Sequence, residues 1–336
     1  MNYEELSATI DHLLQEGKGI LAADESTNTI GKRFASINLE NNEENRKNYR
    51  LLLANTKDLE KYINGVILFE ETFQNKDKSG TPIAEIFTRK GILPGIKVDK
   101  GLVSLPNTED EKVTQGLDGL YERLVHYKEQ GAKFAKWRNV YSISDFTPSL
   151  TAMKAGAEML ARYATTCQSV GIVPIVEPEV LIDGDHSIEH CAEATEMVLH
   201  ELFNALYVHQ VDLELIVLKP SMVTCGKNYK PFSSPEEIAE FTISVFRNHV
   251  PASVPTINFL SGGQTPQQAA ENLNAINCLG YQPWNLSFSY GRALQEECLQ
   301  IWKGQESNAE RAQAVLLNRA RLNSLACLGE YNPDME

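Results

Sequence analysis

Charged side chains follow apolar, strand-like runs in this sequence, and one lysine shows the pattern most sharply. Lys219 ends the apolar run LELIVLK and precedes Pro220. Because proline cannot donate a hydrogen bond to a β-ladder, the strand should end there, with Lys219 at its C-terminal edge. An ammonium group in apolar surroundings has a lowered pKa, which frees the amine as a nucleophile. A lysine with a buried stem and a solvent-exposed ammonium is the plainer interpretation, and this stretch alone favours it.

The other strand-like runs carry ionisable residues at the same position. An unpaired charge inside an apolar strand costs on the order of several kcal/mol, so a structural ion-pair network would explain one or two such residues but not a whole series. Alternation with a period of two places Lys136 and Arg138 on one face of their strand, and Glu177 and Glu179 on one face of theirs. In chain order the series is Asp24 and Glu25, Glu70 and Glu71, Lys97 and Asp99, Lys136 and Arg138, Glu177 and Glu179, and Lys219.

Glycine and serine end the last two strand-like runs, in FLSGGQ and FSYGRAL. Consecutive glycines let backbone N–H groups converge on an anion, and Arg292 adds a guanidinium at the start of a helix. A simple turn accounts for the glycine pair alone, but in a barrel this is the usual place for a phosphate. The predicted phosphate-binding residues are Ser261, Gly262, Gly263, Ser289, Gly291 and Arg292, with Lys97 on the opposite side for a second phosphate.

Eight strand-like runs alternate with longer helical patterns, and this arrangement must position the charged residues. The runs are residues 19–24, 65–73, 95–99, 134–140, 171–179, 213–219, 254–260 and 284–290. Alternating strands and helices specify a parallel sheet with right-handed crossovers. An open doubly wound sheet is the alternative, but GILAADES stands where its G-x-G-x-x-G motif would follow the first strand.

We therefore predict an α/β fold with a single domain over residues 1–336, a (β/α)8 TIM barrel. An extra amphipathic N-terminal helix over residues 3–16 precedes the barrel, and C-terminal helices over 293–302 and 308–326 follow it. Barrel interiors fill in layers from alternate strands, so Lys136 and Lys219, on strands four and six, are expected in one layer. There, the ammonium of Lys136 would lower the pKa of Lys219 further by like-charge repulsion, as a carbonyl-attacking lysine requires near neutral pH.

The overall charge is strongly acidic, with 45 acidic residues against 31 basic ones and a net charge of −14. Such a chain is a poor partner for nucleic acid or an anionic membrane, so an anionic ligand needs a local cluster of cations. Six cysteines are scattered singly, which predicts reduced thiols. Neither a signal peptide nor an apolar run of membrane-spanning length is evident, and we expect a cytoplasmic protein.

Taken together, the strand-end motifs resemble those of class I fructose-1,6-bisphosphate aldolases, in the same order and at the same spacing. The likeness runs from about Gly17 to about Leu328. It implies a (β/α)8 barrel that needs no metal or cofactor, acts on a phosphosugar and is commonly a homotetramer. The motifs are LAADEST, GVILFEETF, GIKVDKG, TQGLDGL, FAKWR, ARYA, GIVPIVEPE, DGDH, LKPSMVT, FLSGGQ, LNAIN and FSYGRAL.

The resemblance also implies a role for each catalytic residue. Lys219 forms a Schiff base with the keto carbon, and Glu177 is the acid/base that dehydrates the carbinolamine. Lys136 assists that step electrostatically, and Asp24 lies near the hydroxyl that loses its proton. Glu179 belongs to the same catalytic group. The residues matched to phosphate-binding positions are Ser261, Gly262, Gly263, Ser289, Gly291 and Arg292 for one phosphate, and Arg33, Lys97 and Arg138 for the other. The protonated imine is an electron sink, so cleavage between the third and fourth carbons yields dihydroxyacetone phosphate and glyceraldehyde 3-phosphate.

One feature of the animal members is missing from this sequence. Their chains end in a flexible tail whose terminal tyrosine helps to protonate the enamine, whereas Tyr331 follows the last helix too closely to be that residue. The sequence is therefore either a truncated or a tailless member of such a family. Two rivals remain beside the aldolase prediction. Another Schiff-base barrel, similar to transaldolase or deoxyribose-phosphate aldolase, would not need two separate phosphate sites. A non-catalytic phosphosugar-binding or scaffold protein on the same barrel would not need all four of Asp24, Lys136, Glu177 and Lys219.

Overall fold

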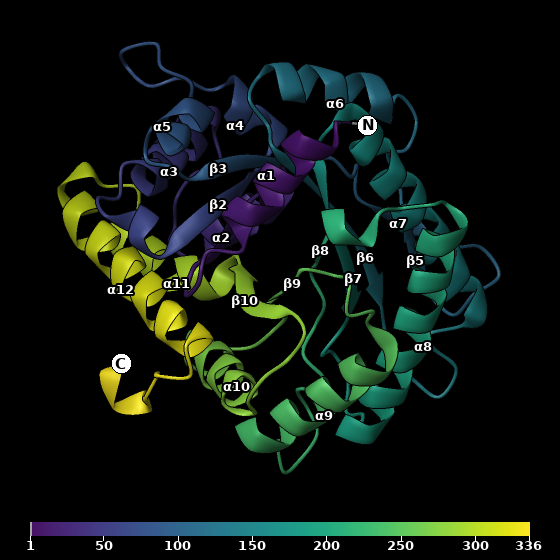
Figure 1. Cartoon of the computed structure of the whole chain (residues 1–336). Coiled ribbons are helices and arrows are strands. Elements are labelled where there is room, and N and C mark those ends of the chain that lie inside the picture. The colour runs from purple at the N-terminus through teal and green to yellow at the C-terminus, as the bar shows by residue number, and fades with distance from the viewer. Residues whose placement is uncertain (1) are drawn as a thin grey trace.

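Eight parallel strands form a closed barrel at the centre of the molecule (Figure 1). The computed structural model describes residues 2–336. The barrel strands are β1 (Gly19–Ala23), β2 (Ile63–Leu68), β3 (Leu93–Lys97), β6 (Phe134–Tyr141), β7 (Val173–Val180), β8 (Val217–Leu218), β9 (Thr256–Phe259) and β10 (Asn285–Tyr290). Each strand pairs with the next one along the chain, and β10 pairs with β1 to close the ring. The predicted (β/α)8 barrel is confirmed.

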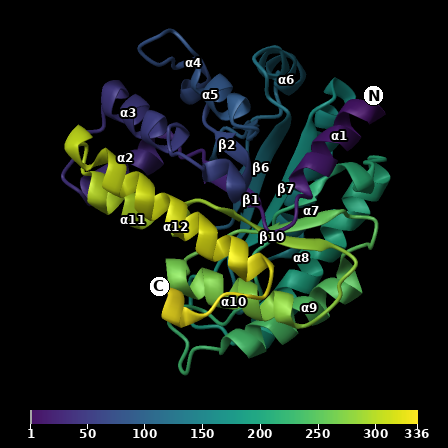
Figure 2. The ribbon, with the colours of Figure 1, turned by 60° about the vertical axis from the view of Figure 1, so that its left-hand side comes forward.

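Helices surround this barrel on the outside (Figures 1 and 2). They are α1 (Tyr3–Leu13), α2 (Thr27–Ala35), α3 (Glu43–Ala54), α4 (Glu70–Gln74), α5 (Ile83–Arg89), α6 (Leu120–Glu129), α7 (Leu150–Val170), α8 (Ile188–Val208), α9 (Pro235–His249), α10 (Pro266–Cys278), α11 (Arg292–Trp302) and α12 (Ala309–Cys327). Ser234 and Thr265 cap α9 and α10, each followed by proline. The cap of α7 is Ser149, which accepts from the N–H of Ala152.

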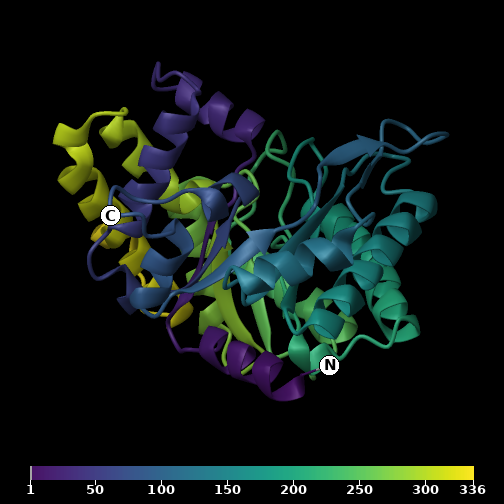
Figure 3. The same cartoon turned by 90° about the horizontal axis from the view of Figure 1, so that it is seen from above.

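Helix α1 covers the N-terminal end of the barrel, which leaves the opposite end for chemistry (Figure 3). Its buried side chains Leu6, Ile10 and Leu13 belong to the same apolar cluster as Phe134 and Val173, the first residues of β6 and β7. These residues stand on one stripe of the helix, so burying them removes a single apolar face from water. The extra N-terminal helix is thus confirmed as a plug at the end of the barrel where the strands begin.

Inside the barrel, glycine makes room for a large ring. A Cβ atom added to Gly95 of β3 would lie 2.1 Å from the ring of Phe134 on the adjacent strand. Such a contact is far inside van der Waals distance, so only glycine fits at this position. A second and larger apolar cluster fills the space between the strands and the surrounding helices. The strands are therefore buried on both faces, as their near-continuous apolar sequences predict.

Three details of the predicted elements were wrong. The expected strand over residues 213–219 begins as a 3-10 turn, Leu213–Leu215, because the Asp212 carboxylate accepts from the N–H of Glu214; only Val217–Leu218 is strand. The run expected over 65–73 ends as strand at Leu68, and Glu70 instead opens the short helix α4. An antiparallel hairpin, β4 (Leu102–Ser104) with β5 (Lys112–Thr114), was not predicted.

Candidate active site

A cavity of about 850 Å³ opens at the C-terminal ends of the strands. All fourteen residues that the sequence predicts for the site line it. They are Asp24, Arg33, Lys97, Lys136, Arg138, Glu177, Glu179, Lys219, Ser261, Gly262, Gly263, Ser289, Gly291 and Arg292. Most of them lie in barrel strands or directly after them, so the closed ring of strands brings together residues up to 268 positions apart in the chain, Asp24 and Arg292. The fold thus gathers these side chains into one site.

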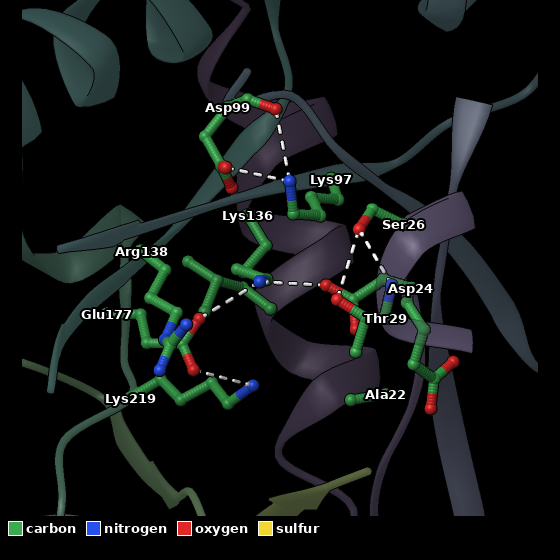
Figure 4. A network of polar contacts seen from close by, with 12 residues as sticks. Ala22, Asp24, Ser26, Thr29, Lys97, Asp99, Lys136, Arg138, Glu177 and Lys219 are labelled. Carbon is green, nitrogen blue, oxygen red and sulfur yellow. Dashed lines mark hydrogen bonds and ion pairs between the residues drawn. The ribbon is translucent and has the colours of Figure 1, made fainter. Parts of the chain in front are cut away.

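A chain of charged contacts runs across the centre of this cavity (Figure 4). The Nζ of Lys219 lies 3.1 Å from Oε1 of Glu177, and the Nζ of Lys136 lies 3.2 Å from Oε2 of the same carboxylate. Lys136 also lies 2.8 Å from Oδ2 of Asp24. The side chains of both lysines and of Glu177 are 5% exposed, so these charges compensate one another with little help from solvent.

Strand register fixes these positions. Lys136 of β6 stands beside Lys97 of β3, and Arg138 two residues later stands beside Glu177 of β7, so the alternating residues of the strands share one face. Lys219 follows the two-residue strand β8, and its backbone N–H donates to the carbonyl of Val176 at 2.8 Å. The ladder therefore continues one residue past the strand and holds the lysine backbone in place.

The central charges shift one another's protonation. Burial alone would raise the pKa of Glu177 and of Asp24, but the neighbouring lysine ammonium groups outweigh burial and hold both pKa values below their ordinary range. Burial would likewise lower the pKa of Lys136, yet the carboxylates of Asp24 and Glu177 raise it. Two carboxylates and the ammonium of Lys136 are therefore charged at neutral pH.

Two further ion pairs flank the centre. Arg138 donates from Nε to a carboxylate oxygen of Glu179. Lys97 lies 2.7 Å from Oδ1 of Asp99, with its ammonium on the cavity wall. Both cations keep part of their surface open to the cavity, since the side chain of Arg138 is 39% exposed and that of Lys97 is 15% exposed. Each is held by one carboxylate and still has donors available for an anion.

The loops after β9 and β10 form the other wall. Gly262 and Gly291 bring backbone close to neighbouring atoms, because an added Cβ would lie 2.7 Å from Leu260 and 3.2 Å from the carbonyl oxygen of Ala22. The hydroxyl of Ser289 is buried and has no hydrogen-bond partner within residues 2–336. Arg292 is the first residue of α11 and lines the same cavity. Free backbone donors, a buried hydroxyl and a guanidinium are the groups that bind phosphate.

Several cavity residues were not predicted for the site. They are Glu25, Ser26, Thr29, Lys32, Ser36, Asp183, Lys227 and Glu296, beside four apolar residues. Glu25 stands at a strand end, which the sequence does show, but the others lie in loops or helices without a strand pattern to place them. The wall as a whole carries eight Lys and Arg side chains against six Asp and Glu, in a chain of net charge −14. The cavity thus offers an anion the local cation cluster that the acidic composition requires.

Tyr331, by contrast, lies away from the cavity. Its hydroxyl donates to a carboxylate oxygen of Glu336 at 2.7 Å, and its N–H donates to Asn274 on α10 at 3.0 Å. The side chain is buried against the apolar cluster outside the barrel. Tyr331 is therefore a packing residue, in agreement with its position soon after the last long helix.

A closed parallel barrel with buried lysines around a carboxylate, beside glycine-rich loops and a guanidinium, is typical of a class of enzyme in which a lysine amine attacks the carbonyl of a phosphorylated substrate. Comparison with known proteins identifies the family within this class. The family model "Fructose-bisphosphate aldolase class-I" matches residues 5–336. The chain therefore belongs to the class I fructose-bisphosphate aldolase family, as the motifs predict, and it is an enzyme, a carbon–carbon lyase.

Individual relatives agree over nearly the whole chain. It is 51% identical to the probable fructose-bisphosphate aldolase class 1 of Xanthomonas axonopodis pv. citri, covering 98% of this chain and 99% of the relative. It is 52% identical to the cytosolic fructose-bisphosphate aldolase 4 of Arabidopsis thaliana, covering 99% and 85%. A crystal structure of the Plasmodium falciparum aldolase, in complex with TRAP and a small-molecule inhibitor, superposes with a TM-score of 0.97 at 51% identity, covering 98% of this chain and 95% of that one.

The comparisons confirm the predicted catalytic function on a phosphosugar substrate. They favour this function over both alternatives, a non-catalytic scaffold protein and another Schiff-base barrel. No helix within residues 2–336 combines the length and the apolar character needed to cross a membrane.

Proposed function

We propose that the enzyme cleaves fructose 1,6-bisphosphate reversibly to dihydroxyacetone phosphate and glyceraldehyde 3-phosphate, with Lys219 as the Schiff-base lysine. The observation that carries this assignment is the contact chain Lys219–Glu177–Lys136–Asp24, in which the amine lies 3.1 Å from a carboxylate that a second ammonium also contacts. Nucleophile and proton acceptor are thus within hydrogen-bond distance. Of the two lysines in this chain of contacts, Lys219 has a single carboxylate partner, whereas Lys136 contacts the carboxylates of both Glu177 and Asp24.

Glu177 is proposed to move the protons of imine formation. In the resting site two ammonium groups lower its pKa and keep it ionised, so it can accept the proton that Lys219 loses. When Lys219 becomes the neutral nitrogen of the carbinolamine, one of these two charges disappears and the pKa of Glu177 rises. The carboxyl group then holds a proton within reach of the departing hydroxyl, which leaves as water when the protonated imine forms.

Lys136 and Asp24 are proposed to act on the far side of Glu177. The raised pKa of Lys136 keeps its ammonium charged throughout, so it stabilises negative charge without exchanging its proton. Asp24 is a carboxylate at 2.8 Å from that ammonium and is placed to accept the proton of the substrate hydroxyl on the fourth carbon. Loss of that proton breaks the bond between the third and fourth carbons. The electron pair moves into the protonated imine to give the enamine.

The two walls of the cavity are proposed to hold the two phosphates. One phosphate fits the loops after β9 and β10, where Ser261, Gly262, Gly263, Ser289, Gly291 and Arg292 offer donors. Lys97 and Arg138 are proposed to bind the other phosphate. Arg33, which the resemblance groups with them, lies beside the Gly291 turn and is therefore proposed for the first phosphate. Glu179 contacts Arg138 and not the central lysines, so we propose that it orients this guanidinium within the catalytic group.

Trapping the covalent intermediate tests this assignment. Borohydride reduction in the presence of dihydroxyacetone phosphate should add one three-carbon phosphate unit to Lys219, because reduction makes the imine permanent, and mass mapping of the peptides should locate it. Lys219→Arg keeps the charge without a comparable nucleophile and should show no adduct. An adduct on Lys136, or none in the unaltered enzyme, would contradict the assignment.

The proposal also covers three properties of the whole protein: its domain organisation, its oligomeric state and its location in the cell. We infer that residues 1–336 are one domain, since the first and last barrel strands pair with each other. We infer a homotetramer from the family resemblance, which light scattering of the purified enzyme will test. A cytoplasmic location is supported by the cytosolic relative of Arabidopsis thaliana and by six cysteines without a disulfide.

A further inference from the structure

A carboxylate stands on the wall of the cavity where an anion should bind. Glu25 follows β1 and its side chain is only 3% exposed, yet it lines the cavity beside Arg33. Arg33 donates to Oε1 of Glu25 and has 24% of its side chain exposed. An ionised carboxylate next to a phosphate site repels the ligand unless a further cation compensates it. The structure therefore has to supply that cation from behind the wall.

Arg50 supplies it. This residue of α3 is 4% exposed, and its Nη2 lies 2.7 Å from Oε2 of Glu25. Its guanidinium also lies over the ring of Tyr49, at 5.6 Å from the ring centre. Its Nη1 has no hydrogen-bond partner within residues 2–336, so burial leaves one of its donors without a partner in the protein. Burying a cation this way is costly, and its only carboxylate contact in the structure is Glu25.

Gln295 of α11 fixes the carboxylate from a third direction. Its Nε2 lies 3.1 Å from Oε1 of Glu25, 2.7 Å from the carbonyl oxygen of Ala22 and 3.2 Å from that of Gly291. Its Oε1 accepts from the hydroxyl of Tyr49 at 3.2 Å. The end of β1, helix α3 and the turn that opens α11 are thereby joined around one carboxylate.

The outcome of this network is the position of Arg33. With Glu25 fixed by Arg50 and Gln295, the guanidinium of Arg33 lies beside the turn of Gly291, 3.9 Å from where a Cβ atom of that glycine would be. Arg33 thus joins the wall on which Ser289 and Arg292 also stand. The three charges of Arg33, Glu25 and Arg50 leave one net positive charge at this wall.

We propose that Arg50 is a positioning residue for phosphate binding, which neutralises and fixes Glu25 so that Arg33 faces the substrate. The inference rests on the proposed function of the cavity and goes beyond it, because Arg50 lies outside the cavity wall. Its partner in the role is Gln295, which ties Glu25 to the Gly291 turn. Removing Arg50 leaves no net charge among these groups and frees Glu25 to draw Arg33 away from the ligand.

The test compares three variants of the full-length enzyme. Arg50→Met should raise the KM for fructose 1,6-bisphosphate about tenfold and leave kcat within about twofold, because a buried charge pair loses one member while the central lysines are untouched. The inhibition constant of inorganic phosphate should rise by a similar factor. Arg50→Lys restores the charge, and the double variant Arg50→Met with Glu25→Gln restores the net charge of the wall. Both should recover much of the lost affinity.

The outcomes separate this inference from its alternatives. An unchanged KM in Arg50→Met, or a raised KM that neither Arg50→Lys nor the double variant recovers, would overturn the role of Arg50. If Arg50→Met does not fold, the double variant decides: a KM near that of the unaltered enzyme supports the inference, and a KM raised about tenfold contradicts it. Borohydride trapping on Lys219 accompanies each assay. If the unaltered enzyme gives no adduct, the proposed function itself is contradicted, and not only the role of Arg50.

Discussion

Glu177 is the residue that we propose as the acid/base, because its single carboxylate contacts both Lys219 and Lys136. Its neighbour on the same face of β7, Glu179, forms its ion pair with Arg138. The two glutamates, two residues apart, contact different cations, and we propose different roles for them on this ground. The sequence alternation places both in the site, but only the structure separates them.

This difference predicts different kinetics. Glu177→Gln should lower kcat by roughly 10²–10⁴-fold, because the amide cannot carry the protons of imine formation and dehydration. Glu179→Gln, the matched control on the same strand face, should mainly raise KM, since it loosens Arg138 and leaves the central contacts in place. Steady-state kinetics on fructose 1,6-bisphosphate measure both. Equal losses of kcat in the two variants would refute the division of roles.

At the scale of elements, the strands were predictable and their surroundings were less so. Buried parallel strands are predicted as apolar runs that carry polar or charged residues toward their ends, and this pattern located all eight strands. Asp24 and Lys219 directly follow their strands, whereas Lys136 and Glu177 lie within theirs. The rule fails where local hydrogen bonds compete with the ladder. Asp212 turns the start of one predicted strand into a 3-10 turn in this way.

Site residues that lie off the strands escaped prediction for a related reason. Lys227 stands in a loop and reaches the cavity through its ion pair with Asp183, a contact between segments 44 residues apart. Arg50 contacts Glu25 from behind the cavity wall, and it comes from the polar helix sequence EENRKNYRLLLA, in which nothing marks it as buried. Such contacts depend on how helices pack on the barrel, and a single sequence carries no periodic signal for them.

The capping box of α10 offers a test at this scale. Thr265 accepts from the N–H of Gln268 at 3.2 Å, and the Gln268 side chain accepts from the N–H of Thr265 at 3.0 Å. Thr265→Ala should lower the free energy of unfolding by about 1 kcal/mol, because the N–H of Gln268 loses its ordered partner. Urea unfolding followed by circular dichroism measures it. Ser244→Ala, exposed within α9, is the control and should not destabilise; equal losses in both variants would contradict the capping argument.

For the whole molecule, the buried carboxylates link stability to pH. Burial opposes ionisation of Asp24 and Glu177, but their lysine neighbours hold both pKa values below those of the unfolded chain. The folded state therefore binds fewer protons, so this stabilisation is complete above a pH of about 4–5 and is lost as the pH falls through the lower folded values. The urea midpoint should fall on acidification below about pH 5, and fall less steeply in Asp24→Asn. The same slope in both proteins would count against it.

The pairing of β1 with β10 has a consequence for how the protein is made. A ribosome delivers β1 first and β10 nearly 270 residues later, so the growing chain holds an open sheet with an unpaired edge until the last strand emerges. Ser289, Gly291 and Arg292 arrive with that strand and complete the phosphate wall at the moment of closure. Until then, Asp24, Lys136, Glu177 and Lys219 are present but the cavity lacks one side. Synthesis that stops after β9 therefore yields a chain that contains Lys219, the proposed nucleophile, but lacks one wall of the cavity.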